Sequence, residues 1–207
     1  MADIQTPIQQ VTGALMTLLQ DRQAGLTVVL QSPAEVTAAT NNELRVSLWL
    51  YLVSENEFGR NPPATATVSS GGGARRSLTA RTEFPDAVVN LYYLATPLTG
   101  LALHDQEVLN TVIRVFHTHG LIRITTDESD LSARRIQDLR ITPCRLALEE
   151  LTRIWDSLRQ PYRLSVCYEV RGLHIPSQVE FSTPVVTEQS GGFGDRPAED
   201  STAAERG

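Results

Sequence analysis

The sequence contains no lysine, because all 18 of its basic residues are arginine. A Walker-A phosphate loop and Schiff-base catalysis both need lysine, so the composition excludes them. Only two cysteines are present, Cys144 and Cys167, and the N-terminus has neither a basic start nor an apolar stretch. We therefore expect an unsecreted chain with reduced thiols. No run approaches the ~18 apolar residues that a membrane-spanning helix needs.

The charge balance is acidic, with 24 carboxylates against 18 arginines and a formal net charge of -6. This balance argues against general nucleic-acid binding, which requires a basic face to neutralise phosphates. Hydrophobic residues make up 41% of the 207 positions, enough for one ordinary core. The composition predicts a soluble, cytoplasmic, acidic protein.

Apolar spacing predicts three helices, one from Pro7 to just before Gly25 and the others near 105–119 and 148–158. Thr6 is placed to cap the first helix, and Gly120 is expected as a left-handed cap after the second. Alternating or continuous apolar runs predict strands near 26–30, 44–53, 87–95, 121–125, 136–142 and 162–171. The 44–53 run ends apolar on both faces, which indicates an interior strand. The fold class is α/β, a mixed sheet flanked by about three helices.

Two segments fall outside this pattern. Residues 54–85 contain few aliphatic residues and several Pro and Gly, so a long irregular loop is expected there. Its basic residues form a candidate partner-binding cluster: Arg75, Arg76 and Arg81. Residues 177–207 form an extended arm with an acidic tip, and its β-prone residues are candidates for pairing with the sheet edge of a neighbouring subunit: Val179, Phe181, Val185 and Val186. Pro184 favours an edge strand.

The sequence offers no catalytic, cofactor or metal site. His117 and His119, two residues apart on a helix, point about 200° apart and cannot grip one ion. Cys167 and His174 lie ~20 Å apart along one predicted strand, so a nucleophile–base pair is not formed. Residues 71–77, GGGARRS, lack the surrounding strand-to-helix turn of a phosphate loop. We predict that the protein is not an enzyme and carries no cofactor.

One stretch carries a resemblance to a known family. Residues 146–175 combine a helix of the form LEELxRxW, a Pro-Tyr turn and a strand reading RLSVxYEVR. This combination resembles the cap, or tail-terminator, proteins of extracellular contractile injection systems of the antifeeding-prophage and virulence-cassette type. Three further segments match in order: 44–61, 91–100 and 104–122. The chain departs from the family at Ala147, where members often have a serine that caps the helix.

The resemblance implies a phage tail-terminator-like fold and a structural role. Residues 1–176, which include the 54–85 loop, would form the ring-forming domain, and the arm at 177–207 would reach the sheath. The implied partners are five further copies in a homohexamer, a tube protein and a sheath protein. The implied location is cytoplasmic, within a phage tail-like particle. Two alternatives stay open: an adaptor that tethers such a particle to a membrane or cargo, and a small hydrolase of unrecognised type.

Overall fold

The structure is a computed structural model. It describes residues 6–37, 43–59, 65–70, 78–83, 85–126, 135–177 and 180–184. The chain divides into two compact units, the first formed by Met1–Pro63 with Pro85–Gln178 and the second by Ala64–Phe84 with Val179–Gly207. The break after Gln178 lies close to the predicted boundary after Pro176. The sequence did not indicate that part of the 54–85 segment belongs with the arm.

The first helix, α1 (Pro7–Arg22), begins at the predicted cap. The Gln9 backbone N–H donates to the Thr6 hydroxyl at 3.4 Å, and the Thr6 N–H donates to the Gln9 side chain at 2.8 Å. This reciprocal capping box satisfies two donors that a helix start otherwise leaves without partners. Gly25 follows the helix with φ 79°, a conformation that glycine adopts without strain.

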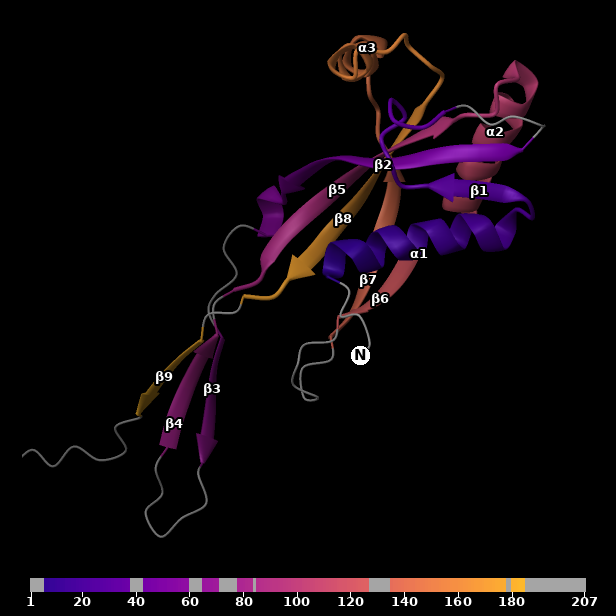
Figure 1. The fold of residues 1–207 in the computed structure, drawn as a ribbon. Helices are drawn as coiled ribbons and strands as arrows, with labels where there is room; N and C mark the ends of the chain where they lie inside the picture. Colours follow the sequence, from indigo (N-terminus) through magenta and orange to yellow (C-terminus); the bar gives the residue numbers. More distant parts are fainter. Residues whose placement is uncertain are drawn as a thin grey trace, which may run out of the picture. The chain divides into compact units, whose positions relative to one another are not determined.

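The main sheet of the first unit has six strands (Figure 1). Their spatial order is β1 (Leu26–Val29), β2 (Leu44–Glu55), β5 (Ala87–Pro97), β8 (Val166–Ile175), β7 (Arg135–Pro143) and β6 (Leu121–Thr126). β1 pairs parallel with β2, and every other neighbouring pair is antiparallel. The predicted interior position of the 44–53 run is confirmed, because β2 lies between β1 and β5. The sheet is curled, and α1 contacts both of its edge strands, β1 and β6.

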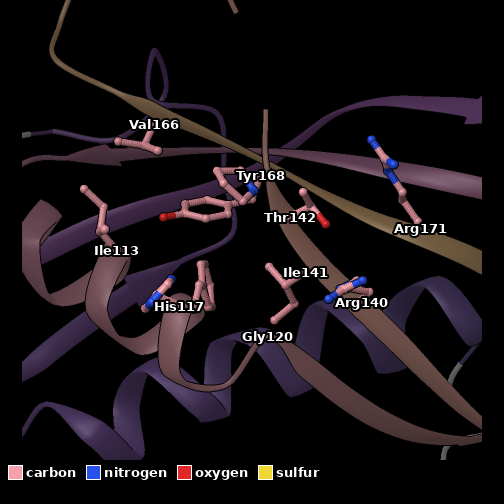
Figure 2. Close-up of a pocket in the computed structure, with 11 residues that line it drawn as sticks. Ile113, His117, Gly120, Arg140, Ile141, Thr142, Val166, Tyr168 and Arg171 are labelled. Carbon is pink, nitrogen blue, oxygen red and sulfur yellow. The ribbon is translucent and has the colours of Figure 1, made fainter. Parts of the chain in front are cut away.

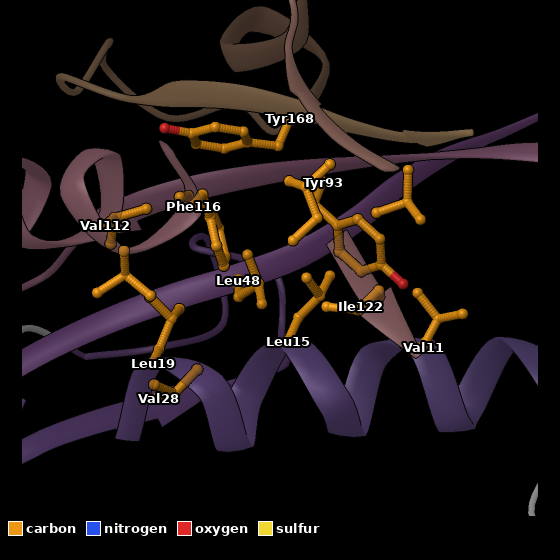
Figure 3. Packing of buried hydrophobic residues seen from close by; sticks show 14 of the residues in the cluster. Val11, Leu15, Leu19, Val28, Leu48, Tyr93, Val112, Phe116, Ile122 and Tyr168 are labelled. Carbon is orange, nitrogen blue, oxygen red and sulfur yellow. The ribbon is translucent and has the colours of Figure 1, made fainter. Parts of the chain in front are cut away.

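One face of this sheet carries the hydrophobic core (Figure 3). Helices α1 and α2 (Ala102–Thr118) both pack against the sheet and against each other. Phe116 of α2 meets Tyr168 of β8 edge to face, with ring centroids 4.8 Å apart. The largest side chains of the core are almost completely buried: Leu15, Leu19, Leu48, Leu91, Tyr93, Leu139 and Leu173.

Two local predictions for this unit are wrong. The last strand was expected at 162–171, but β8 spans Val166–Ile175 because its later residues pair with the start of β5, where Ala87 is opposite Ile175. Gly172, at φ 78°, lets the strand continue past the predicted end. The second correction concerns Gly120, which is not among the glycines with positive φ. His119 is instead the residue that caps the C-terminus of α2, and its N–H donates to the Val115 carbonyl at 2.8 Å.

The third helix, α3 (Leu148–Ser157), starts at Ala147, which has no side chain able to accept a hydrogen bond. Only half of a capping box remains, because the Ala147 N–H still donates to the Glu150 carboxylate at 2.8 Å. Trp155 is the one fully buried residue of α3, and Leu148 at its start is 66% exposed. Figure 1 shows α3 apart from α1 and α2. Its apolar stripe is therefore only partly covered.

The second unit contains three strands, which corrects the expectation of an irregular loop. β3 (Thr65–Ser70) and β4 (Leu78–Glu83) form a hairpin, and β9 (Glu180–Pro184) pairs antiparallel with β4. Pro62 and Pro63 before β3 and the three glycines between the hairpin strands dominated the sequence pattern. The short segments TATVSS and LTARTE are nevertheless rich in Thr, and β-branched residues favour strands.

Candidate partner-binding surfaces

The backbone register of the three-stranded sheet joins two segments that are far apart in the sequence. It aligns Ala66 with Thr82 and Phe181, and Val68 with Ala80 and Thr183. The hairpin and the arm therefore form one sheet in the second unit.

Two of the predicted partner-binding residues belong to this sheet. Arg81 of β4 is opposite Ser182 of β9, and Phe181 is opposite Thr82, so Arg81 and Phe181 lie on opposite faces. Loop and arm, which the sequence treated as separate surfaces, are thus neighbouring strands of one sheet. The remaining candidates lie outside the described residues: Arg75, Arg76, Val179, Val185 and Val186.

The strand order β3-β4-β9 leaves two edges. The sequence predicted that the arm would pair with the sheet of another subunit, yet residues 180–184 pair with β4 of their own chain. The hairpin supplies the complementary strand that sequence reasoning could not see. Among the described strands, β9 lies at an edge of this sheet, and Pro184 at its end agrees with an edge position. Such an edge can accept a further strand from a partner.

A buried polar network joins β5 and β8 on the face of the main sheet away from the core. Glu169 is 7% exposed, and one of its oxygens accepts from the Tyr92 hydroxyl at 2.9 Å and from the Asn90 amide at 3.1 Å. Its other oxygen accepts from Arg171 Nε at 2.6 Å. Asn56, which follows β2, donates to Asn90 at 3.1 Å. Burial raises the pKa of the Tyr92 hydroxyl, which remains a donor.

Every partner of Glu169 in this network is a donor, so both carboxylate oxygens accept hydrogen bonds from the sheet, one of them from the guanidinium of Arg171. The arrangement fastens two strands together and leaves no acid–base pair aimed at a substrate. Sequence reasoning missed the network. Its one signal was Asn90, the only polar interruption of the apolar run at 87–95.

Both thiols are free, as predicted, and Cys167 is buried. Its sulfur lies 3.1 Å from the Tyr51 hydroxyl, and the Cys144 N–H donates to the Cys167 carbonyl at 2.8 Å. The hydrogen bond with the Cys167 thiol, together with burial, raises the pKa of the Cys144 thiol, which keeps it in its unreactive form. His174 lies at the far end of β8, where its Nδ1 is 3.6 Å from Asp86. Cys167 and His174 are therefore not brought together.

A groove of about 630 Å³ opens in the first unit between α2, β7 and β8 (Figure 2). Its apolar lining includes Ile113, Phe116, Ile141, Val166 and Tyr168. Figure 2 shows Arg140 and Arg171 at one end, and Ile113 and His117 at the other. Phe116, Ile141 and Tyr168 belong to the core face of the sheet, whereas Arg140 and Arg171 alternate onto the opposite face, which also carries Glu169.

Within the described part of the chain, no cluster of His, Cys, Asp and Glu is suited to hold a metal ion. None of the described helices is long and apolar enough to cross a membrane.

The described residues define a mixed α/β protein with a six-stranded sheet, a three-stranded sheet and a groove with a largely apolar lining. The sequence matches the Pvc16 N-terminal domain family over residues 10–188, and the chain belongs to this family. No curated protein matched the sequence in a comparison.

Two solved structures have a similar fold. One is the sheath/tube terminator of an extracellular contractile injection system in its extended state, with a TM-score of 0.62 and 18% identity over 96% of this chain. The other is the tube-terminating cap of the anti-feeding prophage, with a TM-score of 0.59 and 18% identity over 92% of this chain. This chain spans 66% and 62% of the lengths of those two proteins. The predicted tail-terminator-like fold class is thereby confirmed.

Proposed function

We propose that this protein is a structural cap, or terminator, of a contractile injection system. It ends the inner tube as a ring of six copies and contacts the last layer of sheath. The observation that carries the proposal is the match over 96% of the chain to the fold of a sheath/tube terminator, together with membership of the Pvc16 N-terminal domain family. The protein is made in the cytoplasm and incorporated into a phage tail-like particle.

The two units take different roles in this proposal. The six-stranded unit forms the ring, because it contains the extensive core that a rigid building block needs. The three-stranded unit contacts the sheath through residues of the arm, Val179, Phe181, Val185 and Val186, with the basic residues Arg75, Arg76 and Arg81 as further contacts. The position of β9 supports this assignment, because among the described strands β9 lies at an edge of its sheet, and such an edge gains backbone hydrogen bonds when a partner strand pairs with it.

The protein has no catalytic turnover in this proposal. The buried carboxylate of Glu169 is engaged by donors that belong to the sheet, and Cys167 and His174 lie at different ends of one strand. A chain carrying substitutions at Cys144, Cys167, His104 and His174 is expected to lose some stability and still to cap the tube. Loss of a hydrolytic activity in a variant that remains folded would contradict this part of the proposal.

The sheath contact can be tested with two neighbouring substitutions on β9. Phe181→Asp replaces a proposed contact residue of β9 with a charge, whereas Ser182→Asp places the same charge at the next position, which is not a proposed contact. We expect Phe181→Asp to release the sheath end in assembled particles and Ser182→Asp to leave it held. Truncation after Pro176 is expected to leave a folded six-stranded unit that no longer holds the sheath. Full retention of the sheath by the truncated chain would refute the role of the arm.

A further inference from the structure

Phe58 is the most exposed large apolar side chain of the described residues, at 101%. It lies in the short 3-10 helix η1 (Glu57–Gly59), which follows β2 and is fixed to the sheet. The Phe58 N–H donates to the Asn56 side chain at 2.9 Å, and the Asn56 N–H donates to the Val88 carbonyl of β5 at 2.8 Å. The Asn56 amide also donates to Asn90. The backbone that presents Phe58 is therefore already ordered, which lowers the entropic cost of binding through this side chain.

The end of the groove near Ile113 contains a polar group without a partner. Tyr168 is only 4% exposed, yet its hydroxyl makes no hydrogen bond among the described residues. Figure 2 shows this hydroxyl directed to the end of the groove where Ile113 and Val166 lie. Tyrosine hydroxyls that are buried usually find a hydrogen-bond partner. This end of the groove therefore fits an apolar side chain that has a hydrogen-bond acceptor next to it.

η1 has this combination. Glu57, directly before Phe58, is exposed and makes no ion pair or hydrogen bond with another described residue. None of the described residues that line the groove is acidic, so a carboxylate meets no like charge in the lining. Glu57 can accept from the Tyr168 hydroxyl while Phe58 contacts the apolar lining.

η1 cannot reach the groove of its own chain. It rests on Val88, which is opposite His174 near one end of β8, whereas Val166 is at the other end. Strands rise about 3.3 Å per residue, so these two points of β8 lie roughly 25 Å apart. The occupant that the two surfaces of this chain define is therefore η1 of another copy.

We infer that the groove binds η1 of a second copy of this chain. Phe58 of one copy covers Ile113 and Val166 of the next, and Glu57 accepts a hydrogen bond from the Tyr168 hydroxyl. The two surfaces are different patches of one chain, so the contact repeats from copy to copy and closes into a ring when its rotation allows it. The inference specifies a contact of the proposed ring and rests on the proposed function in that respect only.

The direct test is photo-cross-linking of the full-length variant Phe58→p-benzoylphenylalanine, which keeps an aromatic ring and reacts with nearby C–H bonds. The variant is mixed with isotopically heavy wild-type protein, in concentrated solution and in assembled particles, and mass spectrometry identifies the heavy peptides that it links. The control places the same residue at Leu103, which is 78% exposed and outside the groove lining. We expect position 58 to link the heavy peptides that contain Ile113 or Val166 at least about tenfold more than position 103 does, because binding raises the local concentration. Equal yields, or links from position 58 to a tube or sheath protein instead, would overturn the inference.

A double-mutant cycle tests the hydrogen bond between Glu57 and Tyr168. Glu57→Ala and Tyr168→Phe are each expected to lower the cross-linking yield about tenfold, and the two together no further than either alone. Independent, multiplying losses would contradict the pairing. If the cross-link is absent while the protein is still found at tube ends, this contact is wrong and the proposed function stands. If the cross-link forms while the protein is absent from tube ends, the contact stands and the proposed function is wrong.

Discussion

Removing the hydroxyl of Tyr93 tests the junction between α1 and the sheet. Tyr93 is completely buried, and its hydroxyl lies 2.8 Å from the Thr12 hydroxyl. Thr12 already donates its single hydrogen to the Ile8 carbonyl at 3.0 Å, so Tyr93 is the donor of the shared bond. Tyr93→Phe removes that bond and is expected to lower the free energy of unfolding by about 1 kcal/mol at neutral pH.

The same substitution has the opposite effect in alkali. Burial raises the pKa of Tyr93 from 10.0 to about 12, against a smaller opposing effect of the bond with Thr12. Between these values the unfolded chain loses the proton and the folded chain keeps it, so the wild-type protein loses stability as the pH rises. At about pH 11 this loss amounts to about 1.4 kcal/mol, which the phenylalanine variant does not suffer. The variant should therefore equal or exceed the wild type there.

Urea unfolding followed by tryptophan fluorescence measures this difference, because Trp155 is buried in the folded protein. The other tyrosines titrate in both proteins, so the difference between variant and wild type isolates Tyr93. Tyr168→Phe is a matched control, since burial raises the pKa of Tyr168 to about 12 as well, and no hydrogen bond of its hydroxyl is present in the described structure. At neutral pH, Tyr168→Phe should lower the free energy of unfolding by less than Tyr93→Phe does. At about pH 11 it should avoid a similar loss of stability, because it too removes a buried hydroxyl with a raised pKa. A deficit of Tyr93→Phe that is unchanged between neutral pH and about pH 11 would refute the reasoning.

Five further substitutions test three local features by the same unfolding measurement. Ala147→Ser restores an acceptor at the start of α3 and should raise the free energy of unfolding by about 1 kcal/mol. No gain would show that the missing side-chain cap does not reduce the stability of the protein. Glu169→Gln replaces an acceptor-only carboxylate with an amide at a site whose partners all donate, and it should lower the free energy of unfolding by about 2–3 kcal/mol. Asp138→Asn, in the exposed ion pair with Arg123, should lower it much less. Gly13→Ala in α1 meets no atom within 4 Å and should stabilise by about 0.5–1 kcal/mol, but Gly59→Ala would place its Cβ 2.5 Å from Val88 and should destabilise by about 1–3 kcal/mol. Equal effects of the two glycine substitutions would contradict the packing described around Gly59.

The strongly periodic elements of the first unit could be predicted from sequence. The start of α1 carries its own signal in Thr6, Pro7 and Gln9, and the apolar run at 44–53 indicated an interior strand. The bounds of β8 were harder to predict from the sequence. Its last residues are in a strand because they pair with Ala87 and Val89 of β5, and not because their own apolar pattern indicates a strand. The end of α2 near His119 was predicted correctly, but the left-handed conformation expected at Gly120 was wrong, because glycine permits that conformation without imposing it.

The candidate surfaces depended on long-range pairing that a single sequence does not display. Residues 65–70 and 180–184 are more than 100 positions apart and share a sheet only because β4 lies between them. The Arg140–Arg171 opposition likewise arises from the register of β7 against β8. The apolar stripe of α3 was visible in the sequence, but its incomplete burial was not, because exposure depends on what packs against the helix.

The central claim is that this protein occupies the end of an injection-system tube. Electron cryomicroscopy of particles assembled with the full-length protein, and of particles assembled without it, tests this claim most directly. The account predicts six-fold density for the six-stranded unit on the tube end, with the three-stranded unit against the last sheath layer, and an open tube end when the protein is omitted. An unoccupied tube end in complete particles, with the protein bound elsewhere, would contradict it.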